Sequence, residues 1–260
     1  METLRSPHGC AWDRKQTHAT LAPFLIEEAY EAVDRIDRGD LDGLAGELGD
    51  VLLQCVFHAQ IAAEARRFDI VDAIDAISAK LVRRHPHVFT AAGRPLPKAA
   101  QRRSRVKTPA AVKEQWERIK ADEQGASGQR PRVLAGVPRA MPALLRAHQI
   151  GTRVASVGFD WHHVSDVVAK IDEEVRELRD ALNESPARAA EELGDLLFAV
   201  ASLARRLGLE PESALRQANE KFVRRFTAVE AEMERQGRSV HASTLEEMDE
   251  VWRAVKTREK

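Results

Sequence analysis

A chain of 260 residues with 40 basic and 41 acidic side chains has almost no net charge, which excludes a general attraction to nucleic acid or anionic membranes. Its hydrophobic content of 43% excludes an intrinsically disordered protein. Cys10 and Cys55 have no zinc-site or C-x-x-C spacing, and the longest apolar run, 196–204, is too short to span a membrane. We therefore expect a protein of a reducing, cytoplasmic compartment with no membrane partner.

The first half of the chain is expected to be helical. Ala, Leu, Glu and Arg dominate, and apolar residues recur at the three- and four-residue spacing of amphipathic helices. Pro86 ends the third of these segments, because the residue before a proline avoids the helical conformation. The stretch 91–110 holds three prolines and a basic cluster and is expected to be irregular. The expected helices cover residues 17–38, 41–64, 69–84 and 111–123.

The helical pattern restarts after 125–131, whose sequence G-A-S-G-Q-R-P is typical of a linker. Residues 158–161 are expected to form a turn between two helices. No pair of candidate strands occurs in either half, so we predict an all-α fold of antiparallel helical bundles. The expected helices of the second half cover residues 141–155, 164–183, 186–207, 211–236 and 244–258.

An acidic pattern, E-E-x-x-E followed by E-L-G-D on the next helical segment, occurs once in each half of the chain. Three further landmarks are repeated in the same order, which indicates an internal duplication. We therefore predict two tandem helical-bundle repeats, residues 1–124 and 132–260, joined by the linker 125–131. The repeated landmarks are Trp12 and Trp161, K-x-x-R-R at 80–84 and 221–225, and W-x-x-x-K at 116–120 and 252–256.

Four carboxylates in each half are expected to converge. Acids three residues apart share one face of a helix, so each pattern presents two acids from each of two neighbouring helices. Like charges beside apolar runs are costly without a cation, and Mg²⁺ prefers such oxygen ligands. A solvated acidic surface is the alternative, but the ordered repeat of both pieces favours a metal site. The predicted ligands are Glu174, Glu177, Glu192 and Asp195, with Glu28, Glu31, Glu47 and Asp50 as a possible second site.

Basic side chains follow the acids one helix later. Lys221, Arg224 and Arg225 lie on about one helical turn, where Arg offers a forked donor to phosphate and Lys a point charge. Taken alone, this turn could be a plain helix surface, and Trp252 could stack on a base or pack the last helix onto the core. Acids for Mg²⁺ combined with bases for phosphate favour phosphoryl or nucleotidyl chemistry. The chain has no P-loop or Rossmann motif, and the basic cluster at 98–107 lacks interleaved aromatics, which disfavours a nucleic-acid partner.

Several longer motifs resemble a known family. Over nearly its full length the chain is similar to the all-α nucleoside triphosphate pyrophosphohydrolases, in the tandem form of the MazG family. Ala11 stands where the family usually has proline in G-C-P-W-D, and few residues precede Gly9, so a preceding helix found in relatives is expected to be missing. The motifs that carry the resemblance are G-C-A-W-D at 9–13, R-R-H-P-H-V-F at 83–89, V-G-F-D-W at 157–161, N-E-K-F at 219–222 and E-V-W at 250–252.

The resemblance implies hydrolysis of a nucleoside or deoxynucleoside triphosphate to the monophosphate and pyrophosphate with Mg²⁺, by a homodimer. It also implies that the second repeat is the active one, although the first keeps all four acids. By position in the family motifs, the residues that contact the nucleotide or its phosphates would be Lys170, Lys221, Arg224, Arg225, Trp252 and Lys256.

The reaction implied is attack of water on the α-phosphorus, with Glu173 or Glu177 taking the proton of the water. Two alternatives remain open at this point. One repeat could be a regulatory module that binds a nucleotide or a protein, or the acids could bind structural cations in a helical scaffold. The base, the sugar and the physiological substrate are not determined by the sequence.

Overall fold

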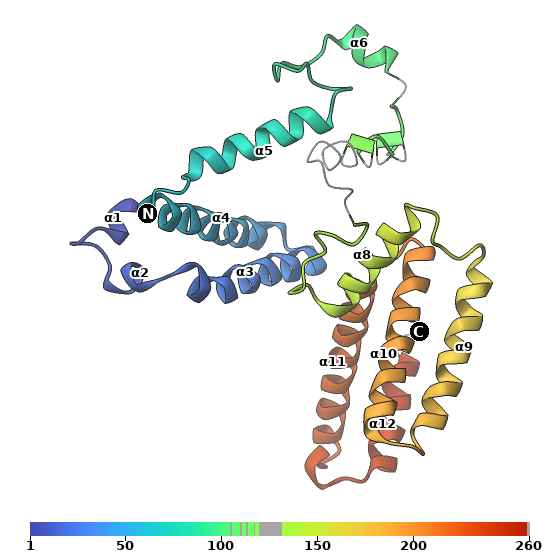
Figure 1. Ribbon diagram of the computed structural model, residues 1–260. Helices are drawn as coiled ribbons and strands as arrows, with labels where there is room; N and C mark the ends of the chain where they lie inside the picture. The colour runs from blue at the N-terminus through green and yellow to red at the C-terminus, as the bar shows by residue number, and fades with distance from the viewer. Residues whose placement is uncertain (105, 110, 113, 117, 120–131, 259–260) are drawn as a thin grey trace. The chain divides into compact units, whose positions relative to one another are not determined.

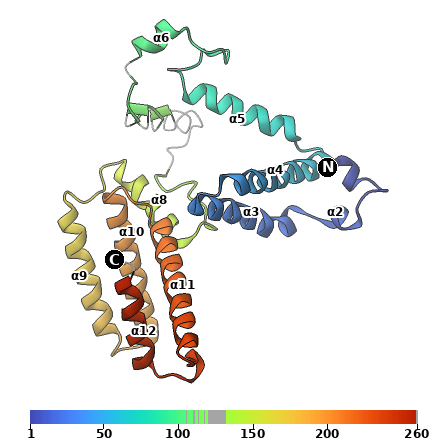
Figure 2. The same ribbon diagram turned by 180° about the vertical axis from the view of Figure 1, so that it is seen from behind.

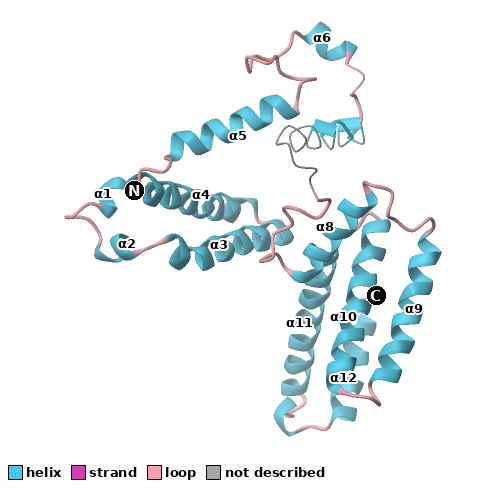
Figure 3. Ribbon diagram, viewed as in Figure 1, coloured by secondary structure: helices cyan, strands magenta, loops and turns pink. Residues whose placement is uncertain are grey.

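The computed structural model describes residues 1–104, 106–109, 111–112, 114–116, 118–119 and 132–258 (Figure 1). Within these residues the regular structure is helical, and β pairing is limited to an isolated bridge between Phe89 and Pro95 (Figure 3). The predicted all-α fold is therefore confirmed. The chain divides into two compact units, unit 1 (Met1–Gln129) and unit 2 (Arg130–Lys260).

Unit 1 is organised around two long helices, α3 (His18–Arg38) and α4 (Leu41–Glu64), which lie side by side (Figures 1 and 2). The connection between them is very short. Gly39 adopts a φ of 69°, and the Asp40 carboxylate accepts a hydrogen bond from the Gly43 amide at 3.0 Å, which caps α4. Such a connection makes the two helices antiparallel, so E-E-x-x-E on α3 comes to lie opposite E-L-G-D on α4.

The remaining helices of unit 1 agree with the sequence only in part. The expectation that 91–110 is irregular is wrong over α6, a helix of six residues. Pro97 fixes the backbone ahead of residues with good helix propensity, which is enough for a short helix. Two further helices before α3 are too short to show a period in the sequence. The bounds of these helices are α1 (Glu2–Arg5), α2 (Ala11–Lys15), α5 (Ile70–Arg84) and α6 (Lys98–Arg103).

The predicted helix over 111–123 is only partly described. The described residues between 109 and 119 are helical, except where 110, 113 and 117 are left out. The rest of that helix, with Lys120, and the linker 125–131 lie outside the described residues, as does Arg105 of the basic cluster.

The N-terminal segment is fastened to the ends of α3 and α4. The Arg5 guanidinium donates to both carboxylate oxygens of Glu64, at 2.8 and 2.7 Å, and lies 5.6 Å from the centre of the Phe57 ring. The hydrogen bonds from Arg5 lower the pKa of Glu64. Trp12 then packs edge-on against Phe24 and Phe57, with ring centres 6.1 and 6.5 Å apart. Through Trp12, the G-C-A-W-D motif is therefore held against the α3–α4 pair.

A histidine pair gives unit 1 an expected pH dependence. His18 and His58 stack with their Nδ1 atoms 2.8 Å apart, and His58 Nε2 is buried without a hydrogen-bond partner. Burial, followed by the nearby His18, lowers the pKa of His58. The folded state therefore favours neutral His58, and its stability is expected to fall as pH drops below about 6.5, the unfolded value, towards the lower folded pKa.

Hydrogen exchange of the α4 amides, corrected for the intrinsic rate, measures this dependence. Protection of α4 should decrease between pH 7.5 and pH 5.5 in the full chain. His58→Leu, which copies Leu203 at the equivalent position of unit 2, should reduce the decrease. Equal pH dependence with and without His58 would contradict the prediction.

Unit 2 contains five α-helices among its described residues. α9 and α10 form an antiparallel pair like that of α3 and α4, and α10 lies between α9 and α11 (Figures 1 and 2). Each agrees with the sequence-predicted range within about two residues. Their bounds are α8 (Ala143–Ala155), α9 (Val164–Ala181), α10 (Pro186–Arg206), α11 (Pro211–Arg235) and α12 (Leu245–Arg258), with a 3₁₀ turn at Val240–Ala242.

The core of unit 2 lies between α11 and α12. Val229, Met233, Val251 and Val255 are buried there, and Trp252 packs against them. None of the described helices is both long enough and apolar enough to cross a membrane.

Asp160 anchors the V-G-F-D-W turn to the end of α10. Its Oδ2 accepts hydrogen bonds from Arg205 at 3.1 Å and Arg206 at 3.3 Å, and these cations help lower the pKa of Asp160. Arg205 crosses α8 at the buried Gly151, where an added Cβ would lie 3.0 Å from Arg205 Nε. The glycine therefore leaves room for the arginine that holds the turn before α9 in place.

Candidate functional site

The acids of unit 2 converge where α9 and α10 face each other. Glu174 on α9 and Glu192 and Asp195 on α10 each offer a carboxylate oxygen, and these oxygens lie within 4.8 Å of one another. Glu174 is 4% exposed and Glu192 is 3% exposed, whereas Asp195 lies at the exposed rim. The three-residue spacing in E-L-G-D places the α10 acids on one helix face, as the sequence predicts.

Two cations hold the buried acids in place. Lys170 Nζ lies 2.8 Å from carboxylate oxygens of both Glu173 and Glu174, and these contacts raise the pKa of Lys170. The hydrogen bond that Lys170 donates to Glu173 lowers the pKa of Glu173. Arg188 pairs with Glu192 at 2.5 Å. Each acid of the buried pair is therefore partly neutralised by a cation one helical turn before it.

The acids of unit 2 are chemically suited to a divalent cation. Glu174 Oε2 is buried and accepts no hydrogen bond. Burial, reinforced by Glu174, Glu177 and Asp195, raises the pKa of Glu192, although Arg188 opposes the shift. An unpartnered buried carboxylate oxygen is costly, and an all-oxygen donor set suits a hard cation such as Mg²⁺. The residues present therefore fit the metal that the sequence predicts.

Unit 1 gathers the equivalent acids. Glu28 on α3 and Glu47 and Asp50 on α4 have carboxylate oxygens within 4.8 Å of one another. Burial, followed by the charges of Asp50 and Glu31 and of other nearby acids, raises the pKa of Glu28. Arg35 pairs with Glu47 at 2.9 Å. This cluster also fits a divalent cation, but its surroundings differ from those in unit 2.

The fourth acid of each pattern stays outside the cluster. Glu31 and Glu177 are exposed on α3 and α9. Each is close enough to act electrostatically, since Glu31 raises the pKa of Glu28 and Glu177 raises that of Glu192. The structure therefore brings together three of the four acids predicted for each site and places the fourth beside them.

The predicted nucleotide-binding residues occupy two different places. Lys170 touches the acids directly. The other candidates lie on α11 and α12, and Trp252 packs against Phe222 with ring centres 5.2 Å apart as well as against the core. Core packing, one of the two roles considered for Trp252, is thus observed. The candidates on these two helices are Lys221, Arg224, Arg225, Trp252 and Lys256.

Sequence reasoning missed two cations of the sites. Arg188 lies four residues before Glu192, a spacing that predicts an ion pair along one helix face. The signal was therefore present in R-x-x-x-E directly before L-G-D. Arg35 reaches Glu47 across the turn between α3 and α4, and no local spacing reveals that contact.

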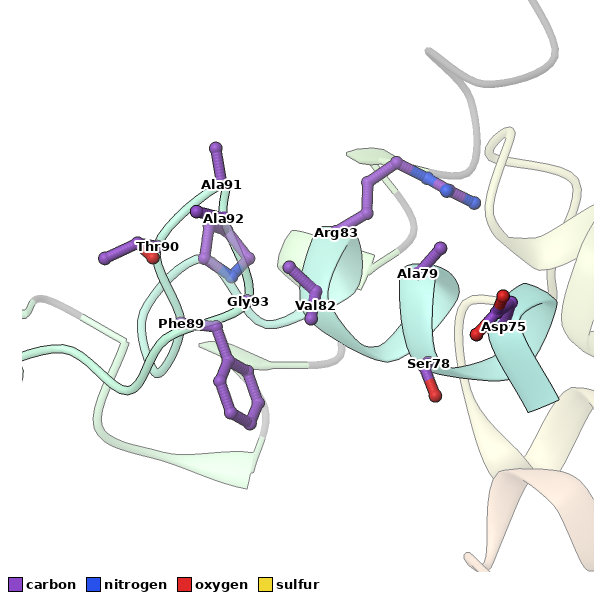
Figure 4. Close-up of a pocket in the computed structure, with 11 residues that line it drawn as sticks. Asp75, Ser78, Ala79, Val82, Arg83, Phe89, Thr90, Ala91, Ala92 and Gly93 are labelled. Atoms are coloured by element: carbon purple, nitrogen blue, oxygen red, sulfur yellow. The ribbon is translucent and has the colours of Figure 1, made fainter. Parts of the chain in front are cut away.

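A separate hollow of unit 1 lies between α5 and the turn that follows it (Figure 4). Val82, Phe89 and the small residues 91–93 form much of its wall, with Asp75 and Arg83 on the helix side. None of the acids of either cluster lines it. The hollow is therefore not part of the acidic sites.

Comparison with known proteins shows that one family model matches a segment of each unit. The family model for the MazG nucleotide pyrophosphohydrolase domain matches residues 16–89 and again residues 163–229. A protein of Escherichia coli K12 named "Nucleoside triphosphate pyrophosphohydrolase" is 46% identical over all of this chain and 95% of its own length. A Thermotoga maritima protein named "Nucleoside triphosphate pyrophosphohydrolase/pyrophosphatase MazG" is 44% identical over 98% of this chain and 92% of its own length.

Proposed function

This chain belongs to the MazG nucleotide pyrophosphohydrolase family, and on that premise we propose that Glu174, Glu192 and Asp195 bind the Mg²⁺ of a nucleoside triphosphate substrate. The chain is an enzyme, a nucleoside triphosphate pyrophosphohydrolase. The observation that carries the assignment to unit 2 is the buried, unpartnered Oε2 of Glu174 inside a cluster of three acids. A buried carboxylate oxygen without a partner is the place where a cation stabilises the site most.

The reaction proposed is water attack on the α-phosphorus, with pyrophosphate as the leaving group. Bound Mg²⁺ would neutralise phosphate charge and lower the pKa of a water. The chain itself would supply the acceptor for the proton of that water. Lys170 lowers the pKa of Glu173 and makes it a weaker base, so we assign the proton acceptor to Glu177, which is exposed beside the cluster.

Substrate phosphates would draw on the cations around the acids. We propose that Lys170 exchanges its contact with Glu174 for a substrate phosphate. The bases of α11 and α12 would complete the nucleotide site.

A homodimer is also proposed. Apolar side chains at helical spacing on α5 are about half exposed, among them Ile74 at 53% and Ile77 at 46%. A second copy that covered this face would remove the apolar stripe from water. We further propose a cytoplasmic location, because both cysteines are free thiols.

The products test the proposed reaction. With Mg²⁺ and a nucleoside triphosphate in ¹⁸O-labelled water, we expect monophosphate and pyrophosphate, with the label in the monophosphate. A chelator should stop turnover and added Mg²⁺ should restore it. Diphosphate and orthophosphate as products, or label in the pyrophosphate, would contradict attack at the α-phosphorus.

A further inference from the structure

The two acidic clusters differ in the residue one helical turn before the first acid. Lys170 lies four residues before Glu174 in unit 2, and Phe24 lies four residues before Glu28 in unit 1. Gly43 of unit 1 holds the position of Arg188 in unit 2, but another arginine of unit 1, Arg35, takes over the ion pair. A Cβ on Gly43 would lie 3.0 Å from the Arg35 side chain, which occupies that space and pairs with Glu47. Of the two cations beside the acids of unit 2, Arg188 thus has a counterpart in unit 1, whereas Phe24 takes the place of Lys170.

This difference changes the charge that a ligand must carry. Lys170 and Arg188 each pair with one clustered acid of unit 2, and each also pairs with a neighbouring acid outside the cluster. Among the described residues of unit 1, Arg35 is the cation that pairs with an acid of the cluster, Glu47, and it also pairs with Asp40. Unit 2 therefore places one more cation beside its acids than unit 1 does. A triphosphate thus suits unit 2, and a ligand with fewer phosphates suits unit 1.

A buried amide extends the cluster of unit 1. Gln54 lies four residues after Asp50 and seven after Glu47, on the same face of α4. It is 6% exposed, and its Oε1 has no hydrogen-bond partner. Unit 2 has Ala199 at the equivalent position. A buried amide oxygen without a donor is unfavourable, so this group indicates a polar ligand that the acids alone would not require.

Two exposed aromatic rings, those of Trp12 and Phe24, lie near the acids of unit 1. Trp12 remains 52% exposed although it packs against Phe24 and Phe57. Phe24, itself 37% exposed, lies four residues before Glu28, about 6 Å along the helix axis. Exposed rings at this distance from a metal-binding cluster suit a base joined to its phosphate by a ribose.

We propose that unit 1 binds a Mg²⁺-coordinated nucleoside monophosphate, the product class of the reaction, with its phosphate at Glu28, Glu47 and Asp50 and its base on Trp12. The identity of the ligand rests on the proposed function, whereas the site rests on the residues of unit 1. Phe24 replaces the lysine that unit 2 offers to further phosphates. Unit 1 is thus a product-binding module that retains the metal acids.

Calorimetry on the full chain carrying Glu192→Gln tests the site, because this substitution removes one of the two buried acids of unit 2 and so weakens metal binding there. With Mg²⁺ present, adenosine and cytidine monophosphates should bind at one site per chain, and added Glu28→Gln should abolish binding. Trp12→Leu should weaken binding by about fivefold or more, as expected for the loss of a base stack. The matched control Trp161→Leu, the equivalent tryptophan of unit 2, should leave the affinity unchanged.

A second substitution, at the exposed Phe24, tests the site independently of whether the Trp12 variant folds. Phe24→Lys copies unit 2 and should shift the preference of unit 1 from monophosphate towards triphosphate by about tenfold or more. No Mg²⁺-dependent monophosphate binding to the Glu192→Gln chain, or binding that survives both Glu28→Gln and Trp12→Leu, would overturn the proposal. If the wild type hydrolyses triphosphates but the Glu192→Gln chain binds no monophosphate, only the second site is rejected. Monophosphate binding without any hydrolysis by the wild type would reject the activity alone.

Discussion

Glu174→Gln is expected to lower kcat for triphosphate hydrolysis by about three orders of magnitude, equivalent to roughly 4 kcal/mol of transition-state stabilisation. The amide has nearly the shape of the carboxylate but removes the charge at the buried oxygen that lacks a partner. Steady-state release of the monophosphate measures the loss, and a Mg²⁺ titration should show weakened binding in parallel. Thermal unfolding is a necessary companion measurement. Because the substitution also breaks the ion pair with Lys170, this measurement must show that the variant remains folded at the assay temperature.

The matched substitution in unit 1, Glu28→Gln, separates the two clusters. The two variants are expected to differ in kcat by at least about two orders of magnitude, with Glu174→Gln the more damaged. Equal losses would contradict the assignment of hydrolysis to unit 2. Unchanged turnover and unchanged Mg²⁺ binding in both variants would contradict the metal hypothesis itself.

Lys170→Met is expected to change two measured quantities in opposite directions. Lys170 lies 2.8 Å from Glu174 and Glu173, so its removal leaves more negative charge at the cluster. Binding of Mg²⁺ alone should therefore become tighter. Removal of a cation proposed to bind a substrate phosphate should at the same time lower kcat/KM by about 100-fold. A residue that merely stabilised α9 would not produce this divergence.

Arg176→Met provides the control on the same helix. Arg176 is exposed on α9, and its Nε donates to the backbone carbonyl of Asp172 at 3.1 Å. Its loss should change the Mg²⁺ affinity and kcat/KM by no more than about twofold, as is usual for an exposed charge. Weaker Mg²⁺ binding in Lys170→Met than in Arg176→Met would contradict the role assigned to Lys170.

Periodicity predicted the long helices well, because each has a polar face and an apolar face that repeat over several turns. α4 was predicted with its observed bounds, and the capping residues Thr17 and Asp69 lie where the sequence starts α3 and α5. The sequence pattern did not predict the short helices α1, α2 and α6, because fewer than two helical turns are too short to show a repeat of apolar residues. The local sequence pattern therefore predicted the long helices that carry the acids better than the short helices around them.

The sequence by itself determined which carboxylates share a helix face, because a spacing of three residues fixes their relative direction on any α-helix. The tertiary structure alone decided that Glu174 joins the cluster and Glu177 stays at its edge. That outcome depends on how α9 is rotated against α10, which the packing of many side chains sets together. The same applies to Arg35, which reaches Glu47 only because a two-residue turn folds α4 back beside α3. The repeated acids make the two units look alike in sequence, and the residues packed around the acids give the two clusters different surroundings.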